Sequence, residues 1–358
     1  MNYRLNKFLS REDFDADTTK VIDINIQDVI SNIVIFYEIT NAAAAMTAHP
    51  AAGITQVELV DGSDVLFSLD GYEIEALDWY HQKGHFPANW NWAMNGGNIQ
   101  RVLRINFGRH LWDRELAFDP KKFNNPQLRI SLDIDAGGNA GTHIFLTCWA
   151  NLFDEQPAEL KGFLMSKEIK EWTMADNTHE YTDLPLDYPY RNLYLRAFSA
   201  GREPNSNVEN IKLSEDQDKR IPYNCGGQEI LRYVQENYPP VEEAYFYAFD
   251  TANRYLYIAP STMVTAYAVT WAQVGAVQNP ALYDGDGGRL KTIATANPQN
   301  NQVFVRGHVP HSVFEIPFGL RDTIEDWYDV RRLGSLRADI EGANAATGYL
   351  FVQQYRPY

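Results

Sequence analysis

The chain has 358 residues, a formal net charge of −16 and an aromatic fraction of 13%. Its length predicts two domains, or one large two-layer domain. The 31 basic residues are outnumbered by 47 acidic ones and nowhere form a run of three. Proteins that wrap nucleic acid need a basic face that releases counterions, so the composition argues against that class and predicts no specific nucleic-acid recognition.

The cysteines and the first residues bear on the compartment. Cys148 and Cys225 are too few and too far apart for a disulfide scaffold or a Cys-based zinc site, although a single bridge stays open. Residues 1–15 lack the apolar core of a secretory signal, and no run reaches the roughly 18 apolar residues needed to span a bilayer. We therefore expect a soluble protein that is made in a reducing cytoplasm.

The first elements predicted along the chain are strands. Residues 22–26 alternate Ile with Asp and Asn, which is typical of a half-buried strand, and residues 32–40 are denser in β-branched and aromatic side chains. Residues 41–53 favour a helix only up to His49, because Pro50 and Gly53 follow, so a loop is expected. Residues 54–69 predict a hairpin that turns at Asp61-Gly62.

Helices are expected to be few and short. The candidate segments are residues 72–80, 113–122, 158–172 and 228–236. Elsewhere strand-like runs alternate with turns rich in Asn, Gly and Pro. Many short strands at turn-bounded spacing favour an antiparallel sandwich or barrel.

The two halves of the chain repeat one pattern. Apolar residues align with apolar residues over five segments that occur in the same order in each half, while polar positions differ. The matched pairs are 32–38 with 192–198, 54–77 with 208–231, 105–116 with 316–328, 128–134 with 336–340, and 141–146 with 347–352. Five collinear matches predict the duplication of a whole β domain. The alternative is that any two strand-rich chains align this well, since identical residues are few.

The second copy contains an insertion. Leu231 and Phe318 are 87 positions apart, whereas their counterparts Leu77 and Phe107 are 30 apart. About 57 residues, rich in Tyr and in strand formers, are therefore added in the second half.

We expect no metal ligand, catalytic residue or cofactor-binding residue. A cupin-type metal site needs two His at positions i and i+2 of one strand, and no such pair exists. The eight His are at positions 49, 81, 85, 110, 143, 179, 308 and 311. A Gly-x-Ser-x-Gly elbow is absent, Cys148 lies in an apolar run typical of an inert thiol, and the Gly-rich residues 137–141 and 285–288 are interpreted as loop tips.

Acidic and Trp residues leave one enzymatic alternative open. Two carboxylates in a sandwich cleft would suit a glycosidase, but the sequence does not show which acids converge. Seven acids beside turns or strand ends are expected to be solvated caps: Asp61, Asp113, Glu115, Asp119, Asp133, Asp135 and Asp339. Four Trp could line a sugar platform, although packing in the core or at an interface is favoured: Trp79, Trp90, Trp92 and Trp112.

The order of these segments resembles a known family. Each half has a hairpin, a short helix, an Ile-x-Phe-Gly segment, a strand that opens with Leu-Arg and a final strand. This arrangement is similar to that of the double jelly-roll major capsid proteins of tailless icosahedral viruses, and residues 57–77 and 105–134 match best. The resemblance implies an all-β fold of two tandem eight-stranded jelly-roll barrels with short flanking helices. It also implies a protein without an active site that forms trimers, which are pseudo-hexameric capsomers and tile a shell.

The resemblance further predicts a division of the chain and a set of partners. Residues 1–155 would form the first jelly roll, 156–185 a linker with a helix, and 186–358 the second jelly roll, with a tower-like insertion at about 235–310. The partners would be further copies of the chain, penton proteins and minor capsid proteins, in the virion of a bacteriophage or archaeal virus assembled in the host cytoplasm. Contact with an internal membrane stays open, because neither end has a clear amphipathic helix or basic arm.

Two rival functions remain. One is a glycan-cleaving amidase or glycosidase built from two jelly rolls, and the other is a carbohydrate-binding or spike module. For the capsid role, the leading residues are the Phe107-Gly108 and Phe318-Gly319 turns, where Gly would allow a backbone conformation or a close approach that other residues do not. Ordinary strand ends are the alternative interpretation of these turns.

Overall fold

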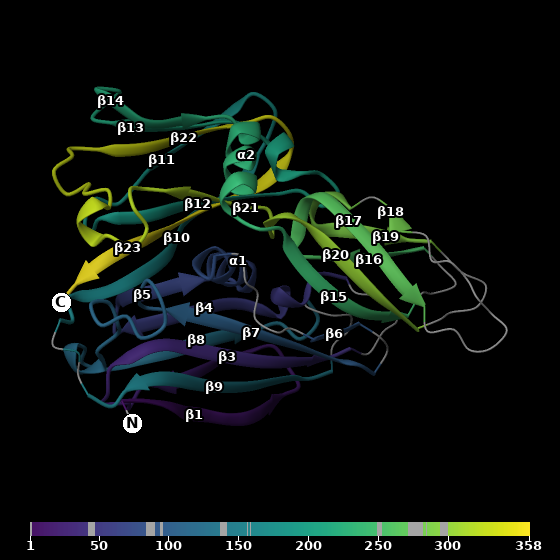
Figure 1. The fold of residues 1–358 in the computed structure, drawn as a ribbon, viewed down its shortest axis with the longest axis horizontal. Coiled ribbons are helices and arrows are strands. Elements are labelled where there is room, and N and C mark those ends of the chain that lie inside the picture. Colours follow the sequence, from purple (N-terminus) through teal and green to yellow (C-terminus); the bar gives the residue numbers. More distant parts are fainter. Residues whose placement is uncertain are drawn as a thin grey trace.

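The computed structural model describes most of the chain and is built mainly of β-strands. The described residues are 2–41, 47–83, 90–93, 96–136, 142–155, 157, 159–248, 253–270, 282–283, 285–293 and 300–358. Figure 1 shows the first half of the chain below the second half, with strands β15 to β20 extending to one side. Of the described helices, neither α1 nor α2 is long and apolar enough to cross a membrane.

The first half forms an eight-stranded jelly roll. Its two sheets have the strand orders β1-β9-β3-β7 and β2-β8-β4-β5. The strands are β1 (Tyr3–Phe14), β2 (Thr18–Asp23), β3 (Ile30–Thr40), β4 (Ile54–Asp61), β5 (Asp64–Leu69), β7 (Asn98–Asn106), β8 (Pro126–Leu132) and β9 (Ile144–Phe153). Counted in chain order, one sheet contains the first, eighth, third and sixth of these strands. The facing sheet contains the second, seventh, fourth and fifth. This is the arrangement of two Greek keys in a jelly roll.

The second half repeats this arrangement strand for strand. Its sheets contain β10-β23-β12-β21 and β11-β22-β13-β14. The strands are β10 (Gly162–Met174), β11 (Thr178–Asp183), β12 (Tyr190–Phe198), β13 (Val208–Glu215), β14 (Arg220–Cys225), β21 (Val313–Pro317), β22 (Leu336–Gly342) and β23 (Ala346–Pro357). All five pairs of segments matched in the sequence fall on equivalent elements, so the predicted duplication and all-β fold class are confirmed.

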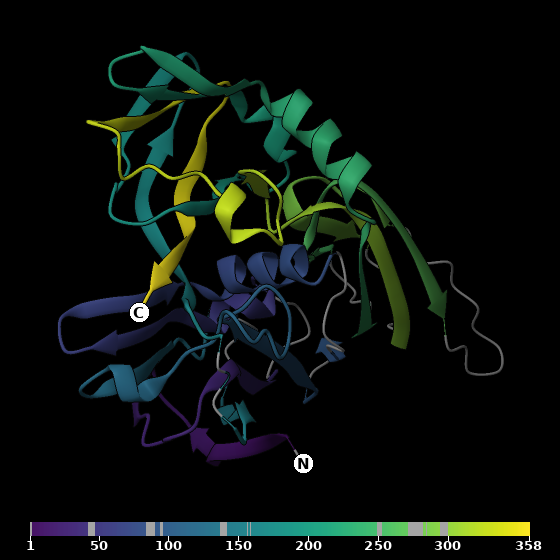
Figure 2. The ribbon, with the colours of Figure 1, turned by 60° about the vertical axis from the view of Figure 1, so that its left-hand side comes forward.

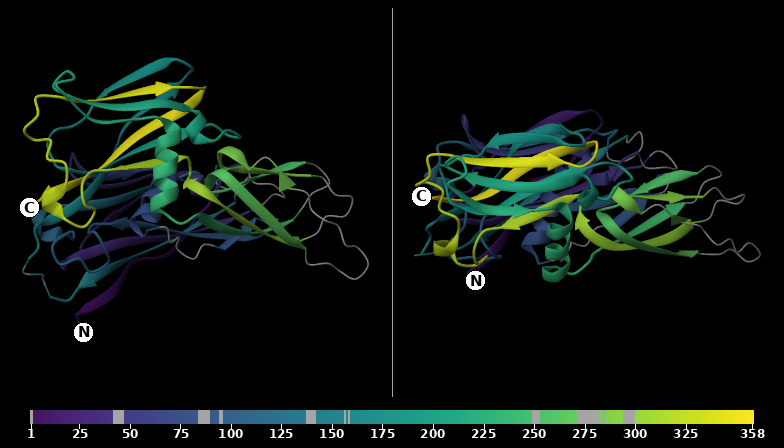
Figure 3. Two further views of the ribbon diagram at one scale, coloured as in Figure 1. Left: turned by 45° about the horizontal axis from the view of Figure 1, so that its top comes forward. Right: turned by 90° about the horizontal axis from the view of Figure 1, so that it is seen from above.

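The extra residues of the second half form a separate β unit. It comprises β15 (Val241–Ala248), β16 (Arg254–Tyr257), β17 (Pro260–Thr270), β18 (Leu282–Tyr283), β19 (Arg289–Thr292) and β20 (Asn300–Pro310). Strands β15-β20-β17 continue the β1-β9-β3-β7 sheet of the first jelly roll through β6 (Trp90–Ala93), because β15 pairs in parallel with β6. The turned views in Figure 3 show this unit beyond one end of both barrels.

The two jelly rolls are joined into one body. Strand β5 pairs in parallel with β10, so that one sheet runs from the first barrel into the second. Helix α1 (Gly71–His81) lies between the barrels (Figure 2), and every residue in it except Tyr72 is buried. Helix α2 (Gly227–Asn237) buries one side only, through Ile230, Leu231 and Val234 among others. A single hydrophobic core contains residues of both barrels and of the insertion.

Two predicted helices are absent. Residues 113–122 form turns that end in a 3-10 helix at Pro120–Lys122, because the Asp113 carboxylate accepts hydrogen bonds from the backbone N–H groups of Arg109, Glu115 and Leu116 and fixes a loop around itself. Residues 158–172 are mostly strand, since β10 pairs with β23 along its whole length. Long-range pairing therefore overrides the local helix preference, and the predicted linker helix is wrong.

Candidate functional site

A buried arginine lies where the first jelly roll meets the insertion. Arg101 of β7 is fully buried and its guanidinium binds two carboxylates. Its Nε donates to Oε1 of Glu75 at 2.8 Å and its Nη2 donates to the other oxygen, while its Nη1 donates to Oε1 of Glu243 at 2.9 Å. Glu75 belongs to α1 and Glu243 to β15, so these charge-assisted bonds connect the two units.

Two histidines extend this network. Nε2 of His311 lies 2.9 Å from Oε2 of Glu75, and Nε2 of His49 lies 3.3 Å from Oε1 of Glu243. The two imidazole rings meet edge to face, with their centroids 4.5 Å apart. His49 is also the N-cap of the 3-10 helix Pro50–Gly53, because its Nδ1 accepts a hydrogen bond from the backbone N–H of Ala51 at 3.1 Å.

The charges of the network follow from its burial and its pairing. Burial is the largest single effect and raises the pKa of both carboxyl groups. The charge of Arg101 and the contacts with the two histidines together outweigh it, so the pKa of Glu75 is about 2 and that of Glu243 lies well below its ordinary value. Burial and the charge of Arg101 both lower the pKa of His49, to about 4. At neutral pH the carboxylates are therefore ionised and His49 is neutral.

By residue type, part of this network could hold a metal ion. Candidate ligand atoms of His49, Glu75 and His311 lie within 4.8 Å of one another, and two His with one Glu are a donor set used for zinc. The hydrogen bonds do not fit such a site. Nδ1 of His49 accepts from Ala51, so the proton of the neutral ring is on Nε2, and both oxygens of Glu75 are bound by Arg101. The arrangement is that of an ion network that fixes the insertion to the first barrel.

The sequence interpretation missed this network, although one signal was present. A cupin-type site would have two His on one strand, whereas His49, Glu75 and His311 come from three separate parts of the chain. Within β7, Ile99, Leu103 and Ile105 point into the barrel, and Arg101 shares their two-residue phase. An arginine at an inward position of an apolar strand predicts a buried acidic partner.

A further buried carboxyl group, separate from the Arg101 network, lies within the second half. Glu315 of β21 is fully buried and accepts hydrogen bonds from Asn192 and Tyr194, each at 3.0 Å, and from Tyr238. Arg321 lies 3.2 Å away. Burial outweighs the Arg191 charge and the Tyr194 hydrogen bond, and it raises the pKa of Glu315 to about 7. Because protein groups enclose this carboxyl group, its geometry indicates a structural role.

The two Phe-Gly turns are places of close approach, as the sequence suggested. A Cβ added to Gly108 would lie 2.4 Å from the carbonyl oxygen of Leu116. Gly319 has a φ of +70°, and a Cβ there would lie 2.1 Å from the carbonyl oxygen of Asp326. The two segments also touch each other, because Arg109, which follows the first turn, donates to the carbonyl oxygen of Asp322, which follows the second, at 2.7 Å. Equivalent corners of the two barrels therefore meet at their junction.

Most of the acids singled out in the sequence are caps or partners of local groups. Asp61 accepts from the backbone of Asn124 and Asn125, Asp119 caps the 3-10 helix at Pro120, and Asp133 accepts from two following N–H groups. Glu115 pairs with Arg109 and Lys161, Asp339 pairs with His179, and the backbone N–H of Asp135 donates to Asp133. Asp113 and Asp119 are buried, so the expectation of solvation is wrong for these two.

The Trp residues and cysteines also have packing roles. Trp79 is fully buried in α1, Trp112 packs against Tyr3 and Phe153, and Trp92 stacks on Phe246 at 4.0 Å. The side chain of Trp90 lies outside the described part. Both cysteines are free, and burial raises the pKa of Cys148 to about 12, as expected of an inert thiol.

Of the two Gly-rich segments that were expected to be loop tips, residues 285–288 have a different structure. Residues 285–288 are no loop tip, because they include a 3-10 helix at Asp286–Gly288 in which Gly287 and Gly288 are buried. A Cβ on Gly287 would lie 2.4 Å from the carbonyl oxygen of Ser199, so this segment packs against the second jelly roll. Residues 137–141 lie outside the described residues, as does His85.

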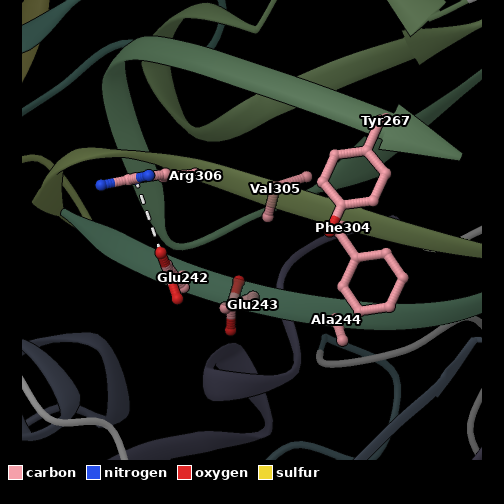
Figure 4. Close-up of a pocket in the computed structure, with 7 residues that line it drawn as sticks. All are labelled: Glu242, Glu243, Ala244, Tyr267, Phe304, Val305 and Arg306. Atoms are coloured by element: carbon pink, nitrogen blue, oxygen red, sulfur yellow. Dashed lines mark ion pairs between the residues drawn. The ribbon is translucent and has the colours of Figure 1, made fainter.

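A surface groove of about 370 Å³ lies along strands β15, β17 and β20 of the insertion (Figure 4). It is lined by Glu242, Glu243, Ala244, Tyr267, Phe304, Val305 and Arg306. Glu242 pairs with Arg306 at 3.5 Å, and the rings of Tyr267 and Phe304 stack at 5.0 Å. The carboxylate of Glu243 is held by Arg101 and its pKa lies well below the ordinary value, so it is unsuited to act as a general acid.

Comparison with known proteins identifies the fold. No protein-family model matches the sequence, and no curated protein matches it. The crystal structure of the STIV major capsid protein matches with a TM-score of 0.60 at 12% identity, over 99% of this chain and 97% of that one. The major capsid protein P2 from bacteriophage PM2 matches with a TM-score of 0.56 at 11% identity, over 99% and 98%. VP54 of PBCV-1, fitted into a reconstruction of the virophage Sputnik, matches with 0.58 at 10%, over 99% and 94%. The chain therefore has the double jelly-roll fold that it shares with the major capsid proteins of STIV and PM2.

Proposed function

We propose that this chain is a major capsid protein, which trimerises into pseudo-hexameric capsomers and tiles an icosahedral virus shell. The observation that carries the proposal is the extent of the structural match. Both jelly rolls, the junction between them and the insertion are covered, and almost nothing of the STIV and PM2 capsid proteins is left unmatched. A fold of this kind hosts many functions, so the complete match supports the role more strongly than either barrel alone would.

The junction between the barrels supports a role in assembly. Each barrel would supply one corner of a pseudo-hexameric unit only if the two barrels hold a fixed orientation. The parallel β5–β10 pairing, the buried helix α1 and the Arg101 network each restrict that orientation. A chain built in this way would present the same lateral faces in every copy.

We also propose a division of the chain that modifies the one expected from sequence. Residues 1–155 form the first jelly roll. The second begins at β10, since β10 and β11 lie in the sheets of the second half and occupy most of the expected linker at 156–185. Strands β15 to β20 form a tower, and their position beyond one end of both barrels supports that role.

The partners and location follow from the role. Further copies of this chain would form the trimer and the neighbouring capsomers, and penton and minor capsid proteins would complete a virion assembled in the host cytoplasm. An internal membrane beneath the shell is a further candidate partner.

Native mass spectrometry combined with negative-stain imaging of the purified chain tests the proposal. We expect a trimer with a hexagonal outline. A strict monomer at every concentration would contradict the capsid role.

The rival enzymatic function has its own test. Incubation of the purified chain with glycopeptides, followed by mass spectrometry of the products, should show no cleavage. Release of glycans by a monomeric chain would favour the amidase or glycosidase alternative.

A further inference from the structure

The insertion contains an edge strand, β17, whose second half lacks the usual protection. The end strands of the described sheets are β1 and β17, β2 and β21, β11 and β14, and β16 and β18. Natural proteins protect sheet edges with charged residues, prolines, bulges or short strands, because an open edge presents unpaired N–H and C=O groups to other chains.

The other edges are protected in these ways. Strand β18 has two residues, and β21 is buried except at Pro317. Each of the others has a charged residue: Arg4 in β1, Lys20 in β2, Glu180 in β11, Arg220 in β14 and Arg254 in β16. Strand β17 has 11 residues and no charged side chain. It has Pro260 at its start and an irregular register between Thr262 and Thr265. Within the described part of the chain, this leaves residues 265–270 as a regular open edge.

The exposed side chains of this edge are apolar or neutral. Tyr267 is 60% exposed and Val269 is 48% exposed, and they lie on the same face of the strand. Tyr267 stacks on Phe304 at the groove of Figure 4, so the open edge borders an aromatic surface. Of the strands in the described part of the chain, only β20 pairs with β17.

We propose that the open edge of β17 pairs with an extended segment of a second copy of this chain. This inference rests on the proposed function and specifies one of its contacts. Main-chain groups at a sheet edge are satisfied by another strand, which gives affinity through backbone hydrogen bonds. Two copies that each have a net charge of −16 repel one another over most of their surfaces, whereas an uncharged strand lets them approach. On the adjoining face, Glu242 and Arg306 neutralise each other.

Two matched lysine variants test this contact. Val269→Lys places a charge on the open edge, and Val21→Lys places one on β2, an edge strand where the same residue type is 47% exposed and Lys20 already stands alongside. We expect Val269→Lys to weaken self-association at least tenfold in sedimentation equilibrium, whereas Val21→Lys associates like the parent. Circular dichroism and thermal unfolding would establish that both variants are folded.

Hydrogen exchange supplies a readout that does not depend on substitution. The backbone amides of residues 265–270 should exchange more slowly in the assembled protein than in a dilute sample. Assembly of Val269→Lys at the parental affinity, with no change in exchange at residues 265–270, would overturn the inference and leave the capsid role standing. A parent chain that stays monomeric would overturn both.

Discussion

At the residue scale, Arg101 couples the insertion to the first barrel through buried ion pairs. A fully buried guanidinium and two buried carboxylates are costly to desolvate, so their mutual pairing compensates for burial and adds little net stability. The consequence of removing one member is much larger, since an unpaired charge then stays in the core. The network therefore favours one placement of the insertion against the first barrel over all others.

Arg101→Met should destabilise the chain strongly. It leaves Glu75 and Glu243 buried without their shared cation, and we expect a loss of about 3–5 kcal/mol in the free energy of unfolding, measured by urea denaturation. Arg104→Met is the matched control on the same strand, because Arg104 pairs with Asp78 at 3.1 Å and is partly exposed. Its loss should be about 1–2 kcal/mol. Equal losses for the two variants would show that the network has no special weight.

The same network predicts a dependence of stability on pH. The pKa of His49 is lowered from 6.5 to about 4, so between these values the unfolded chain binds more protons than the folded one. The contribution of His49 to stability should therefore fall by about 3 kcal/mol as the pH drops from 6.5 to 4. Arg101, Glu243 and His311 face this ring, and protonation of its Nδ1 would also break the bond from Ala51.

The contribution of His49 can be isolated by comparing two proteins. The raised pKa of Glu315, about 7, acts in the opposite direction, since its stabilising effect is lost as the pH rises from 4.5 to 7. That contribution is common to the parent and to His49→Gln, so it cancels in the difference. Urea unfolding at several pH values should give a steeper acid loss for the parent. Parallel curves would refute the assignment to His49.

At the element scale, the sequence predicted those strands, turns and helices that are stabilised by residues close together in the chain. The hairpin at Asp61-Gly62 and the helix after Asp70 were predictable, because turn residues and a capping box between Asp70 and Glu73 specify them within a few positions. Strand β10 was not, because its partner β23 is far away in sequence. The junction network was missed for the same reason, since Arg101 and Glu243 come together only when the insertion folds onto the first barrel.

The corners of the barrels give a prediction about glycine. Gly319→Ala should cost about 3 kcal/mol of unfolding free energy, because a left-handed backbone and a clash with the carbonyl oxygen of Asp326 act together. Gly62→Ala is the matched control, since its φ is +62° and nothing lies within 4 Å of the added Cβ. That variant should lose about 1 kcal/mol. Thermal unfolding of both variants measures the difference, and a smaller loss for Gly319→Ala would contradict the role of close approach at the corner.

At the scale of the whole molecule, the two jelly rolls share one hydrophobic core and one continuous sheet despite their internal duplication. A duplicated chain could behave as two independent domains, each with its own core. Here the sheet shared through β5 and β10, the burial of α1 between the barrels and the common hydrophobic core couple the halves. Hydrogen bonds also cross the junction, from Tyr80 to the carbonyl oxygen of Val313 at 2.7 Å and from Arg321 to that of Tyr80 at 2.8 Å. If either half unfolded by itself, buried residues of α1 would become exposed to solvent.

We therefore expect heat to unfold the whole chain in one cooperative transition. In differential scanning calorimetry the calorimetric and van't Hoff enthalpies should agree, and near-UV circular dichroism and Trp fluorescence should report the same midpoint. The Trp residues make this a test of both halves, since Trp79 and Trp149 lie in the first and Trp172 and Trp327 in the second. Two resolved transitions would show that the junction is weaker than its buried contacts indicate, and the fixed orientation that a capsomer requires would then have to come from contacts with neighbouring copies.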